Sequence, residues 1–478
     1  MTDASHHDYP MLGPLALAER ALSRAAGTSV IDGNSVRLLC DARENYPAWE
    51  AAIEAATSTI NFESYIIHGD AAGRRFVELL AAKAQQGVKV RVLYDWVGAL
   101  GSSSRMLWRA LRAAGVEVRC FNPFRFDNPI GWTERDHRKS ITIDNSVGFV
   151  TGLCVGQQWT GDPEKGREPW RDTGVEVRGP AVAAIARAFA DVWSTTGPPL
   201  PADELPDGRH IPMAGDMKVR VIGSRPSTAG VYRMDQLIAA WASETLWLTD
   251  AYFVGTTSYI QAIRAAAMDG VDVRLLLPMA SDVPVVGALS RASYRPLLEG
   301  GVRIFEWNGP MLHAKTAVAD GKWARVGSTN LNWVSWISNW ELDVVVHDEN
   351  FAADMEEQYE RDLENATEIV LSERNRVQSV APRTRRRRRR GSARGSASRA
   401  AAGAMGIGNA VSAAITNHRT LGPAEARIMA NVGLLLIPVA VVAWKWPRSV
   451  AVPIAVMAAW LGITLLLRAW KLRRERTK

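Results

Sequence analysis

Strand-like and helix-like patterns of hydrophobic residues alternate along the first half of the chain. Residues 60–67, Ile-Asn-Phe-Glu-Ser-Tyr-Ile-Ile, are typical of a strand, and residues 71–85 follow the period of an amphipathic helix. Gly87 ends this helical pattern, and residues 88–94 return to the pattern of a strand. The order of strand, helix and strand indicates an α/β fold.

The same succession of patterns returns in the second half of the chain. Residues 246–253 predict a strand, residues 258–268 a helix and residues 271–277 a second strand. A further matched pair lies at residues 112–120 and 299–305, where in each case a helix ends at a glycine and a strand begins. This repetition predicts a duplicated domain with two similar α/β halves.

Two apolar segments near the C-terminus, residues 428–444 and 450–467, contain no charged residue. Each would span roughly 26 Å as a helix, slightly less than the ~30 Å of a hydrocarbon core. Basic residues precede the first segment and follow the second, and tryptophans lie at the segment ends. The pattern predicts a transmembrane hairpin with both ends on the cytoplasmic side. A buried hairpin packed on the body is the alternative.

Charge is divided unevenly along the 478 residues. The formal net charge is +7, but the segment from Arg374 to the end holds 21 Lys and Arg against two acidic residues, which leaves the first 373 residues at −12. Because an acidic body repels a phosphate backbone, a nucleic-acid partner is not expected. We predict a mostly disordered linker at 374–427. Its six consecutive arginines at 385–390 would either bind anionic lipid or only set the orientation of the hairpin. Nucleic-acid binding by the run is a third alternative, disfavoured because no aromatic residues interleave the arginines for stacking.

These patterns divide the chain into six segments. We expect an N-terminal segment at 1–34, a first half at 35–200, a second half at 201–373, the linker at 374–427, the hairpin at 428–467 and a basic cytoplasmic tail at 468–478. Three widely spaced cysteines allow neither a disulfide framework nor a zinc site. Residues 1–14 lack the pattern of a signal peptide, so we expect the body on the cytoplasmic side of the inner membrane.

Both halves contain an HxKxxxxD motif, whose residues form the candidate catalytic set: His137, Lys139 and Asp144, and His313, Lys315 and Asp320. Apolar alternation makes each motif a strand, so the histidine and the lysine, two positions apart, lie on one face. The aspartates stand at an odd offset and are followed by Asn or Gly. We therefore expect them on the opposite face or in a turn, with a structural or long-range orienting role.

Each half also offers a carboxylate at the start of a later strand. Asp172 heads the segment Asp-Thr-Gly-Val-Glu-Val-Arg, and Glu341 heads Glu-Leu-Asp-Val-Val-Val-His. Such a carboxylate can orient the imidazole of a histidine. The candidate ligands of a bound phosphate are Lys139, Lys315, Ser328 and Asn330, the last two within Gly-Ser-Thr-Asn.

Two histidines and two lysines suit the cleavage of a phosphodiester without a metal. One histidine would attack phosphorus, while the other would protonate the leaving oxygen and then activate a second alcohol or water. The lysines would offset charge on the nonbridging oxygens. Neither a metal nor an organic cofactor is implied. A lone histidine on a strand is usually a core residue, but two complete motifs at equivalent points of a repeat favour catalysis.

Across residues 35–370 the sequence resembles the phospholipase D superfamily, because it carries the paired HxKxxxxD motifs and the Gly-Ser-Thr-Asn segment. The segments Pro-Trp-Arg-Asp-Thr at 169–173 and Met-Leu-His-Ala-Lys at 311–315 are similar to bacterial cardiolipin synthases. The resemblance implies two α/β/α halves that face each other across a pseudo-twofold axis, with one active site between them.

The resemblance also implies roles for individual residues. It implies a phosphatidyl-histidine intermediate on His137, with His313 as the general acid and base. Glu341 matches the carboxylate that orients the second-half histidine, and Asp172 occupies the corresponding place in the first half.

Two features depart from this family. Cys154 stands where a phosphate-side amide is usual, and we expect a small buried residue rather than a reactive thiol. The apolar hairpin follows the catalytic body, whereas membrane helices precede it in the usual cardiolipin synthase. Eight tryptophans, among them Trp159 and Trp170, lie around the two motifs and would form an apolar rim for acyl chains or pack in the core.

The expected function is that of a membrane-anchored phosphatidyltransferase, which passes a phosphatidyl group from one phospholipid to a hydroxyl of another, such as phosphatidylglycerol. A phospholipase D that transfers this group to water is the first alternative. A non-catalytic tether that binds anionic lipid is the second. Both motifs lie in one chain, so a monomer suffices for activity. The expected partners are phospholipid and membrane rather than nucleic acid.

Overall fold

The computed structural model describes residues 14–124, 134–371 and 377–379, together with single positions between 445 and 463. After α1 (Pro14–Ala26), the first half contains β1 (Ile31–Cys40), α2 (Asp41–Ala55), β2 (Thr59–Ser64), α3 (Ala71–Gln85), β3 (Lys89–Asp95), α4 (Trp96–Ala99), α5 (Arg105–Ala113), β4 (Glu117–Phe121), β5 (Lys139–Ile143), β6 (Val147–Thr151), α6 (Gln157–Thr160), β7 (Thr173–Arg178) and α7 (Ala181–Thr195). The second half contains β8 (Met217–Ser224), α8 (Gly230–Trp241), β9 (Thr245–Thr249), α9 (Thr257–Met268), β10 (Asp272–Pro278), α10 (Pro284–Ala292), α11 (Tyr294–Glu299), β11 (Arg303–Trp307), β12 (Thr316–Ala319), β13 (Trp323–Gly327), β14 (Glu341–His347), α12 (Glu349–Glu364), β15 (Ala366–Leu371) and β16 (Val377–Ser379).

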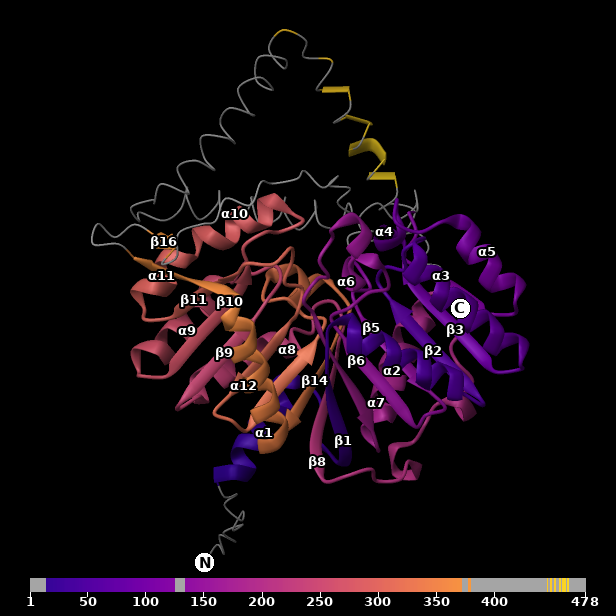
Figure 1. The fold of residues 1–478 in the computed structure, drawn as a ribbon, viewed down its shortest axis with the longest axis horizontal. Helices are drawn as coiled ribbons and strands as arrows, with labels where there is room; N and C mark the ends of the chain where they lie inside the picture. The colour runs from indigo at the N-terminus through magenta and orange to yellow at the C-terminus, as the bar shows by residue number, and fades with distance from the viewer. Residues whose placement is uncertain are drawn as a thin grey trace, which may run out of the picture.

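The described strands form one continuous sheet in which the two halves repeat the same order. From the centre outward the strands run β1-β7-β6-β5-β2-β3-β4 in the first half and β8-β14-β13-β12-β9-β10-β11 in the second, followed by β15 and β16. Strands β1 and β8 pair antiparallel at the centre, with Ile31 opposite Val219. The halves therefore lie side by side (Figure 1), and the predicted duplication of an α/β unit is confirmed.

The predicted elements agree with the structure where local signals are strong. Helix α3 has the predicted bounds, because the Asp70 carboxylate accepts from the Gly73 N–H at 3.0 Å and Gly87, with φ of 92°, follows its end. Strands β2 and β9 end earlier than predicted. Beyond them the chain leaves the sheet, and isolated bridges join Ile67 to Val155 and Val254 to Asn332.

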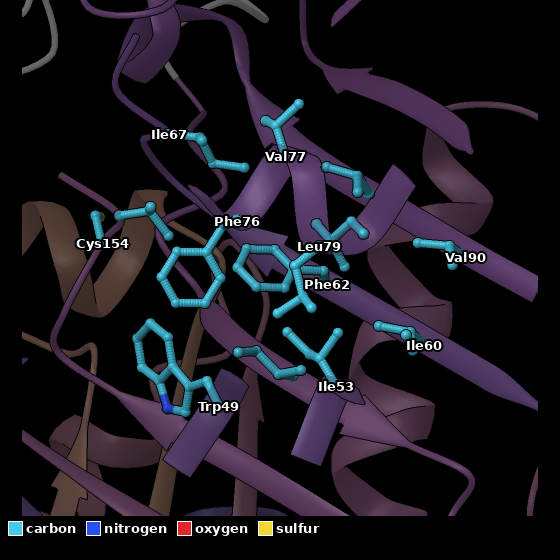
Figure 2. Close-up of a cluster of buried hydrophobic side chains, with 14 of the residues drawn as sticks. Trp49, Ile53, Ile60, Phe62, Ile67, Phe76, Val77, Leu79, Val90 and Cys154 are labelled. Carbon is cyan, nitrogen blue, oxygen red and sulfur yellow. The ribbon is translucent and has the colours of Figure 1, made fainter. Parts of the chain in front are cut away.

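Of the four hydrophobic clusters among the described residues, the three largest hold this architecture together. The first-half cluster includes Trp49, Phe62 and Phe76, whose rings lie between the sheet and the helices α2 and α3 (Figure 2). The second half has a similar cluster around β9, β10 and α9. A third cluster combines first-half residues such as Val177 with second-half residues such as Phe351. Since each buried aliphatic or aromatic side chain contributes about 1.5–3 kcal/mol, this shared cluster stabilises the contact between the halves.

The N-terminal helix α1 packs on the second half rather than on the first. Leu22 and Ala26 belong to the second-half cluster. The buried Arg220 of β8 donates to the Glu19 carboxylate and to the Ser23 hydroxyl. The described part of the predicted segment 1–34 therefore completes a core that lies almost 200 residues further along the chain.

The predicted hairpin at 428–467 lies largely outside the described residues, and the tail at 468–478 lies entirely outside them. In the part of the chain that the structure describes, no helix has the length and apolar character needed to cross a membrane. Most of the predicted linker at 374–427 lies outside the described residues, and β16 is the part of it that the structure describes. There the backbone of residues 377–379 pairs with the edge strand β15, with Leu371 opposite Val377.

Candidate active site

The two HxKxxxxD motifs lead into central strands of their halves. Strand β5 begins at Lys139 and lies between β2 and β6, and β12 begins directly after Lys315 and lies between β9 and β13. The side chain of His137 is 13% exposed and that of His313 is 5% exposed. A strand is present in each motif, but it begins later than predicted, because both histidines and Lys315 precede the first strand residue.

Each histidine pairs with the carboxylate of the opposite half. Nδ1 of His137 lies 2.9 Å from Oε2 and 3.1 Å from Oε1 of Glu341. Nδ1 of His313 lies 2.7 Å from Oδ2 of Asp172. The prediction that Glu341 orients the second-half histidine and Asp172 the first-half histidine is therefore wrong, because each carboxylate reaches across the boundary between the halves.

Backbone contacts across that boundary explain the exchange. The N–H of His137 donates to the carbonyl of Trp340 at 2.9 Å, and the N–H of His313 donates to the carbonyl of Arg171 at 2.7 Å. Each motif thus runs beside the start of a strand from the other half. The next residue, Glu341 at the start of β14 or Asp172 directly before β7, then meets the imidazole.

The paired carboxylates determine which histidine nitrogen carries hydrogen. An ionised carboxylate only accepts, so each Nδ1 donates and each Nε2 keeps its lone pair. Burial would raise the pKa of Glu341 and of Asp172, but the partner histidine and the nearby lysines bring it below its ordinary value. The carboxylates are therefore ionised at neutral pH.

Both histidines are neutral in the free protein at pH 7. Burial lowers the pKa of His137 to about 4, although the charge of Glu341 opposes this shift. Burial, assisted by the charge of Lys315, lowers the pKa of His313 to about 3 against the opposing charge of Asp172. Each ring therefore presents an unprotonated Nε2, the form required of a nucleophile or a base.

The lysines are buried beside the histidines. Each ammonium donates to the backbone carbonyl of the histidine two positions earlier, and Nζ of Lys315 lies 3.1 Å from Nδ1 of His313. Burial lowers the pKa of Lys315 to about 8, with Lys139 adding to the shift and Asp172 opposing it. Each lysine also lowers the pKa of the histidine from the other half. The four motif side chains therefore lie close enough for their charges to influence one another.

Two tyrosines flank the paired motifs, and the sequence analysis did not identify them. The ring of Tyr65 lies edge-on to His137 at 5.1 Å between centroids, and its centroid is 5.3 Å from Nζ of Lys139. The ring centroid of Tyr252 lies 5.9 Å from that of His313 and from Nζ of Lys315. An aromatic face stabilises a buried ammonium. Both tyrosines lie near the ends of the matched strands predicted at 60–67 and 246–253, and this shared position could have identified them from the sequence.

The motif aspartates are structural and do not contact the histidines. Asp144 accepts from the backbone N–H groups of Thr57, Ser58 and Thr59 at 2.7–2.8 Å, and Asp320 accepts from three equivalent N–H groups at residues 243–245. Both aspartates have positive φ, at 49° and 51°. Each joins the turn after a motif strand to the start of its neighbour, β2 or β9. These contacts agree with the structural role expected for the two aspartates.

Replacement of Asp144 tests this division of roles. Burial would raise its pKa, but the N–H donors lower it to about 2, so its stabilising contribution is complete above about pH 4 and falls as pH approaches 2. Asp144→Ala should lower the free energy of unfolding by about 1–2 kcal/mol without changing kcat. Denaturant titrations at pH 7 and pH 3 measure the effect, which should shrink at pH 3. A large loss of kcat in folded Asp144→Ala protein would contradict the structural role.

Ser328 and Asn330 are both buried in the loop that follows β13. The hydroxyl of Ser328 donates to Oε2 of Glu341 at 2.5 Å and accepts from the N–H of Leu342 at 2.9 Å. Nδ2 of Asn339 donates to Oε1 of Glu341 at 3.0 Å. Ser328 therefore positions Glu341 in this conformation, while the carboxamide oxygen of Asn330 has no hydrogen-bond partner among the described residues.

Asp172 is held by a different set of donors. Nε1 of Trp159 donates to its Oδ2 at 2.9 Å, and the N–H of Thr173 donates to its Oδ1 at 2.9 Å. The rings of Trp159 and Trp170 also pack against the imidazole of His313, each with centroids 5.7 Å apart. A Cβ at Gly152 would lie 2.1 Å from Oδ1 of Asp172, so only glycine leaves room for the carboxylate. Trp159 is thus a buried positioning residue.

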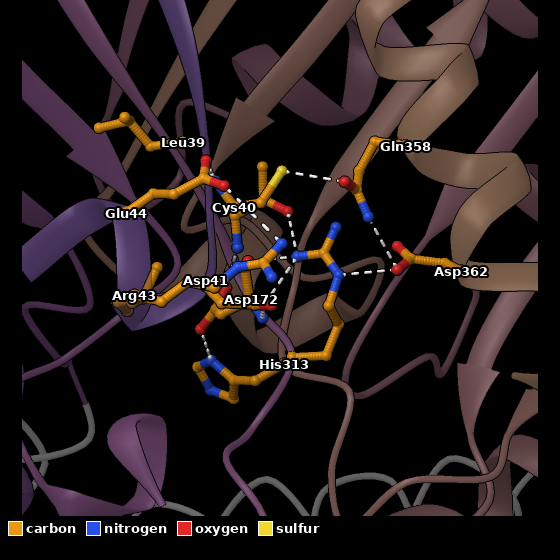
Figure 3. A network of polar contacts seen from close by, with 12 residues as sticks. Leu39, Cys40, Asp41, Arg43, Glu44, Asp172, His313, Gln358 and Asp362 are labelled. Atoms are coloured by element: carbon orange, nitrogen blue, oxygen red, sulfur yellow. Dashed lines mark hydrogen bonds and ion pairs between the residues drawn. The ribbon is translucent and has the colours of Figure 1, made fainter.

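A buried arginine joins Asp172 to the second half (Figure 3). Nε of Arg171 donates to Oδ1 of Asp362 in α12 at 2.8 Å, and Nη1 lies 3.3 Å from Oδ1 of Asp41. The same Asp41 oxygen accepts from the N–H of Asp172 at 3.0 Å. Gln358 donates to Asp362 at 3.0 Å. This network supports Asp172 from behind and spans both halves.

Cys154 is a small buried residue, as expected. It belongs to the first-half hydrophobic cluster (Figure 2), and its carbonyl accepts from the Tyr46 hydroxyl at 2.7 Å. Burial raises the pKa of its thiol, which disfavours the reactive thiolate.

The described residues contain no group of three or more His, Cys, Asp or Glu side chains arranged to hold a metal ion. They do provide two neutral imidazoles, each oriented by a carboxylate, and two ammonium groups in one buried site. This set can supply a nucleophile, a proton donor and cationic stabilisation of a phosphoryl group.

Comparison with known proteins agrees with this geometry. A family model described as "Cardiolipin synthase, PLD-like domain" matches residues 50–159 and 236–363, which include both motifs. Cardiolipin synthase A of Pseudomonas aeruginosa is 34% identical over 363 residues, which cover 75% of this chain and 73% of the relative. Cardiolipin synthase of Halalkalibacterium halodurans is 32% identical over 374 residues, with coverage of 77% and 73%.

A solved structure shows the same fold at much lower identity. Phosphatidylserine synthase of Haemophilus influenzae Rd KW20 has a TM-score of 0.59 at 14% identity, and the match covers 74% of this chain and 92% of that one. The paired motifs, the duplicated sheet and the identity to curated relatives lead to one assignment. The chain belongs to the phospholipase D superfamily, within the group of cardiolipin synthases.

Proposed function

We propose that this protein is a membrane-anchored phosphatidyltransferase of the cardiolipin synthase type, with the body on the cytoplasmic side of the inner membrane. The observation that carries the proposal is the crossed pair His137–Glu341 and His313–Asp172 in one site with Lys139 and Lys315. The apolar segments at 428–467 would supply the anchor. Because one chain holds both pairs, a monomer suffices for turnover.

The transfer takes place in two displacements at phosphorus. Nε2 of His137 attacks the phosphorus of one phosphatidylglycerol, and the bond from phosphorus to the glycerol headgroup oxygen breaks as His313 gives that oxygen a proton. His313 then takes the proton from a hydroxyl of a second phosphatidylglycerol. That oxygen attacks phosphorus, and the bond between phosphorus and His137 breaks. The products are cardiolipin and glycerol, and both histidines return to their initial state.

Binding of the substrate would allow His313 to take up from solvent the proton that it needs. The free imidazole is neutral because burial and the adjacent Lys315 lower its pKa. A phosphodiester carries one negative charge, which offsets the charges of Lys139 and Lys315 and raises the pKa of both histidines. Proton uptake should therefore accompany substrate binding.

The pH dependence of activity should reflect the titration of the Lys315 ammonium. Since its pKa is lowered to about 8, the ammonium is charged below that pH and neutral above it. kcat/KM should fall as pH rises through about 8, because a cation beside the phosphate is lost. Lys315→Arg should lower the rate at pH 7, since a guanidinium fits this site poorly, but should remove the fall near pH 8. If the fall of kcat/KM near pH 8 were unchanged in Lys315→Arg protein, the titration of another group would be its cause.

Lipid mass spectrometry tests the proposed function directly. Purified full-length protein is incubated with phosphatidylglycerol, phosphatidylethanolamine and added glycerol, and products are compared with those of His137→Ala protein. Cardiolipin that appears only with the wild type supports the proposal. Phosphatidic acid as the main product would instead support hydrolysis by a phospholipase D. Lipid binding without any product would support the tether.

A further inference from the structure

Helix α5 presents a basic and apolar face to solvent. Leu107, Trp108 and Leu111 point into the core, where the ring of Trp108 stacks on Tyr94 with centroids 3.9 Å apart. Arg105 and Arg109, four positions apart, lie on the exposed side together with Met106, which is 75% exposed. The helix is thus fixed by one face and leaves a large apolar side chain between two cations in water.

This face is linked to the active site through α4 and Tyr65. Helix α4 packs directly on Tyr65, because a Cβ at Gly98 would lie 2.0 Å from the Tyr65 carbonyl oxygen. Tyr65 in turn contacts His137. Leu100, which is 52% exposed, joins α4 to the loop before α5. Helices α4, α5 and α10 lie along the same upper edge in Figure 1, and α1 lies at the opposite edge.

The second half contributes apolar groups to the same edge. Val285 lies in the first turn of α10, the helix that follows β10 along the chain, and its side chain is exposed. Trp333 lies three positions after Asn330 and is also exposed. Exposed apolar side chains therefore stand on both sides of the site.

The charge of this edge is not balanced within the described part of the protein. No described carboxylate lies within 4.0 Å of the guanidinium of Arg105 or Arg109, and the same holds for Arg20 and Arg24 on α1. The α5 pair differs from the α1 pair in its edge of the molecule and in the exposed Met106 that lies between the two arginines. The first 373 residues carry a net charge of −12. Two cations without a carboxylate partner among the described residues, on either side of an exposed apolar side chain, fit a partner that is both negatively charged and apolar.

We propose that the α5 rim, defined as Leu100, Arg105, Met106 and Arg109, docks the catalytic body onto a bilayer that contains anionic phospholipid. This inference rests on the proposed function. The arginines would contact headgroup phosphates, and Met106 and Leu100 would enter the boundary with the acyl chains. The chain's own segment 374–427 is excluded as the occupant by its positive charge. Docking would bring a bilayer phospholipid headgroup to the site without removing the lipid from the membrane.

Activity on bilayers and on dissolved substrate separates docking from chemistry. Full-length Arg105→Gln/Arg109→Gln protein is compared with Arg20→Gln/Arg24→Gln protein, since Arg20 and Arg24 are also four apart on an exposed helix but lie at the opposite edge. Each arginine near an anionic surface contributes roughly a fivefold gain in binding. The α5 variant should therefore lose roughly tenfold or more on phosphatidylglycerol vesicles and keep its rate on short-chain phosphatidylglycerol below its micelle concentration.

A readout independent of turnover uses an environment-sensitive dye on Met106→Cys protein. Met268, 72% exposed at the far end of α9, provides the matched control as Met268→Cys. Vesicles with phosphatidylglycerol, but not vesicles of phosphatidylcholine alone, should shift the emission of the dye at position 106 only.

The possible results lead to different conclusions. Equal vesicle activity in the two arginine variants, or no dye shift at position 106, would overturn docking. A shift that depends on protein concentration without vesicles would also overturn it, because the partner would then be a second copy. A dye shift at position 106 in protein that makes no product would support docking and refute the proposed function.

Discussion

Protein in which His313 is replaced by asparagine should release one leaving group and then stop. With a phosphatidyl donor that carries p-nitrophenol, departure needs little protonation, so His137 can still attack phosphorus. The phosphatidyl group then stays on His137, because no base remains to deprotonate the accepting alcohol. Stopped-flow absorbance should show a burst equal to the enzyme concentration, and steady turnover should fall roughly ten-thousand- to million-fold.

His137→Asn is the matched variant, because it makes the same replacement at the equivalent point of the other motif. It should lose turnover to a similar extent and show no burst, since the nucleophile is absent. Similar melting temperatures of both variants and the wild type would show that the fold is retained. A burst from His137→Asn alone would exchange the roles of the histidines. A burst from neither or both would refute the two-step mechanism.

Replacement of either carboxylate should slow one of the same two steps. The crossed pairing determines which carboxylate affects which step. Asp172→Asn and Glu341→Gln keep the shape of each side chain but turn its histidine partner toward the wrong tautomer, a change that reduces turnover by about ten-thousand-fold in a comparable triad. Glu341→Gln should slow the p-nitrophenolate burst, because Glu341 orients His137. Asp172→Asn should preserve the burst and slow the following turnover, because Asp172 orients His313.

Pairing within each half would reverse these two results. Ser328→Ala provides a graded control, because it removes one of the hydrogen bonds that hold Glu341 and leaves the carboxylate in place. It should slow the burst much less than Glu341→Gln. A burst slowed by Asp172→Asn and untouched by Glu341→Gln would contradict the geometry described above.

Local signals were sufficient to predict much of the fold and the central site residues. The helix at 71–85, the matched strands and both HxKxxxxD motifs depend on periods and spacings that lie within ten or fifteen residues. The structural role expected for Asp144 and Asp320 also followed from local properties, namely an odd offset from the histidine and a turn residue after it.

Contacts across long separations could not be predicted in this way. The partners His137 and Glu341 are 204 positions apart, and His313 and Asp172 are 141 apart. Their pairing depends on how the two halves pack together, and the hydrophobic periodicity of the sequence does not show this. The same holds for Arg171 with Asp362, and for α1, whose Leu22 completes a core of the second half. Trp159 could be noticed from sequence, but its hydrogen bond to Asp172 depends on the fold.

The crossed pairing also bears on how such a chain can arise. A single half, taken alone, would hold a histidine and lysine without the carboxylate that orients them, so it would be catalytically incomplete. Two identical halves in a symmetric dimer would complete both pairs, since each would lend its carboxylate to the other. Gene fusion would then preserve every contact of the site while freeing the two copies to diverge, one toward attack on phosphorus and the other toward proton transfer.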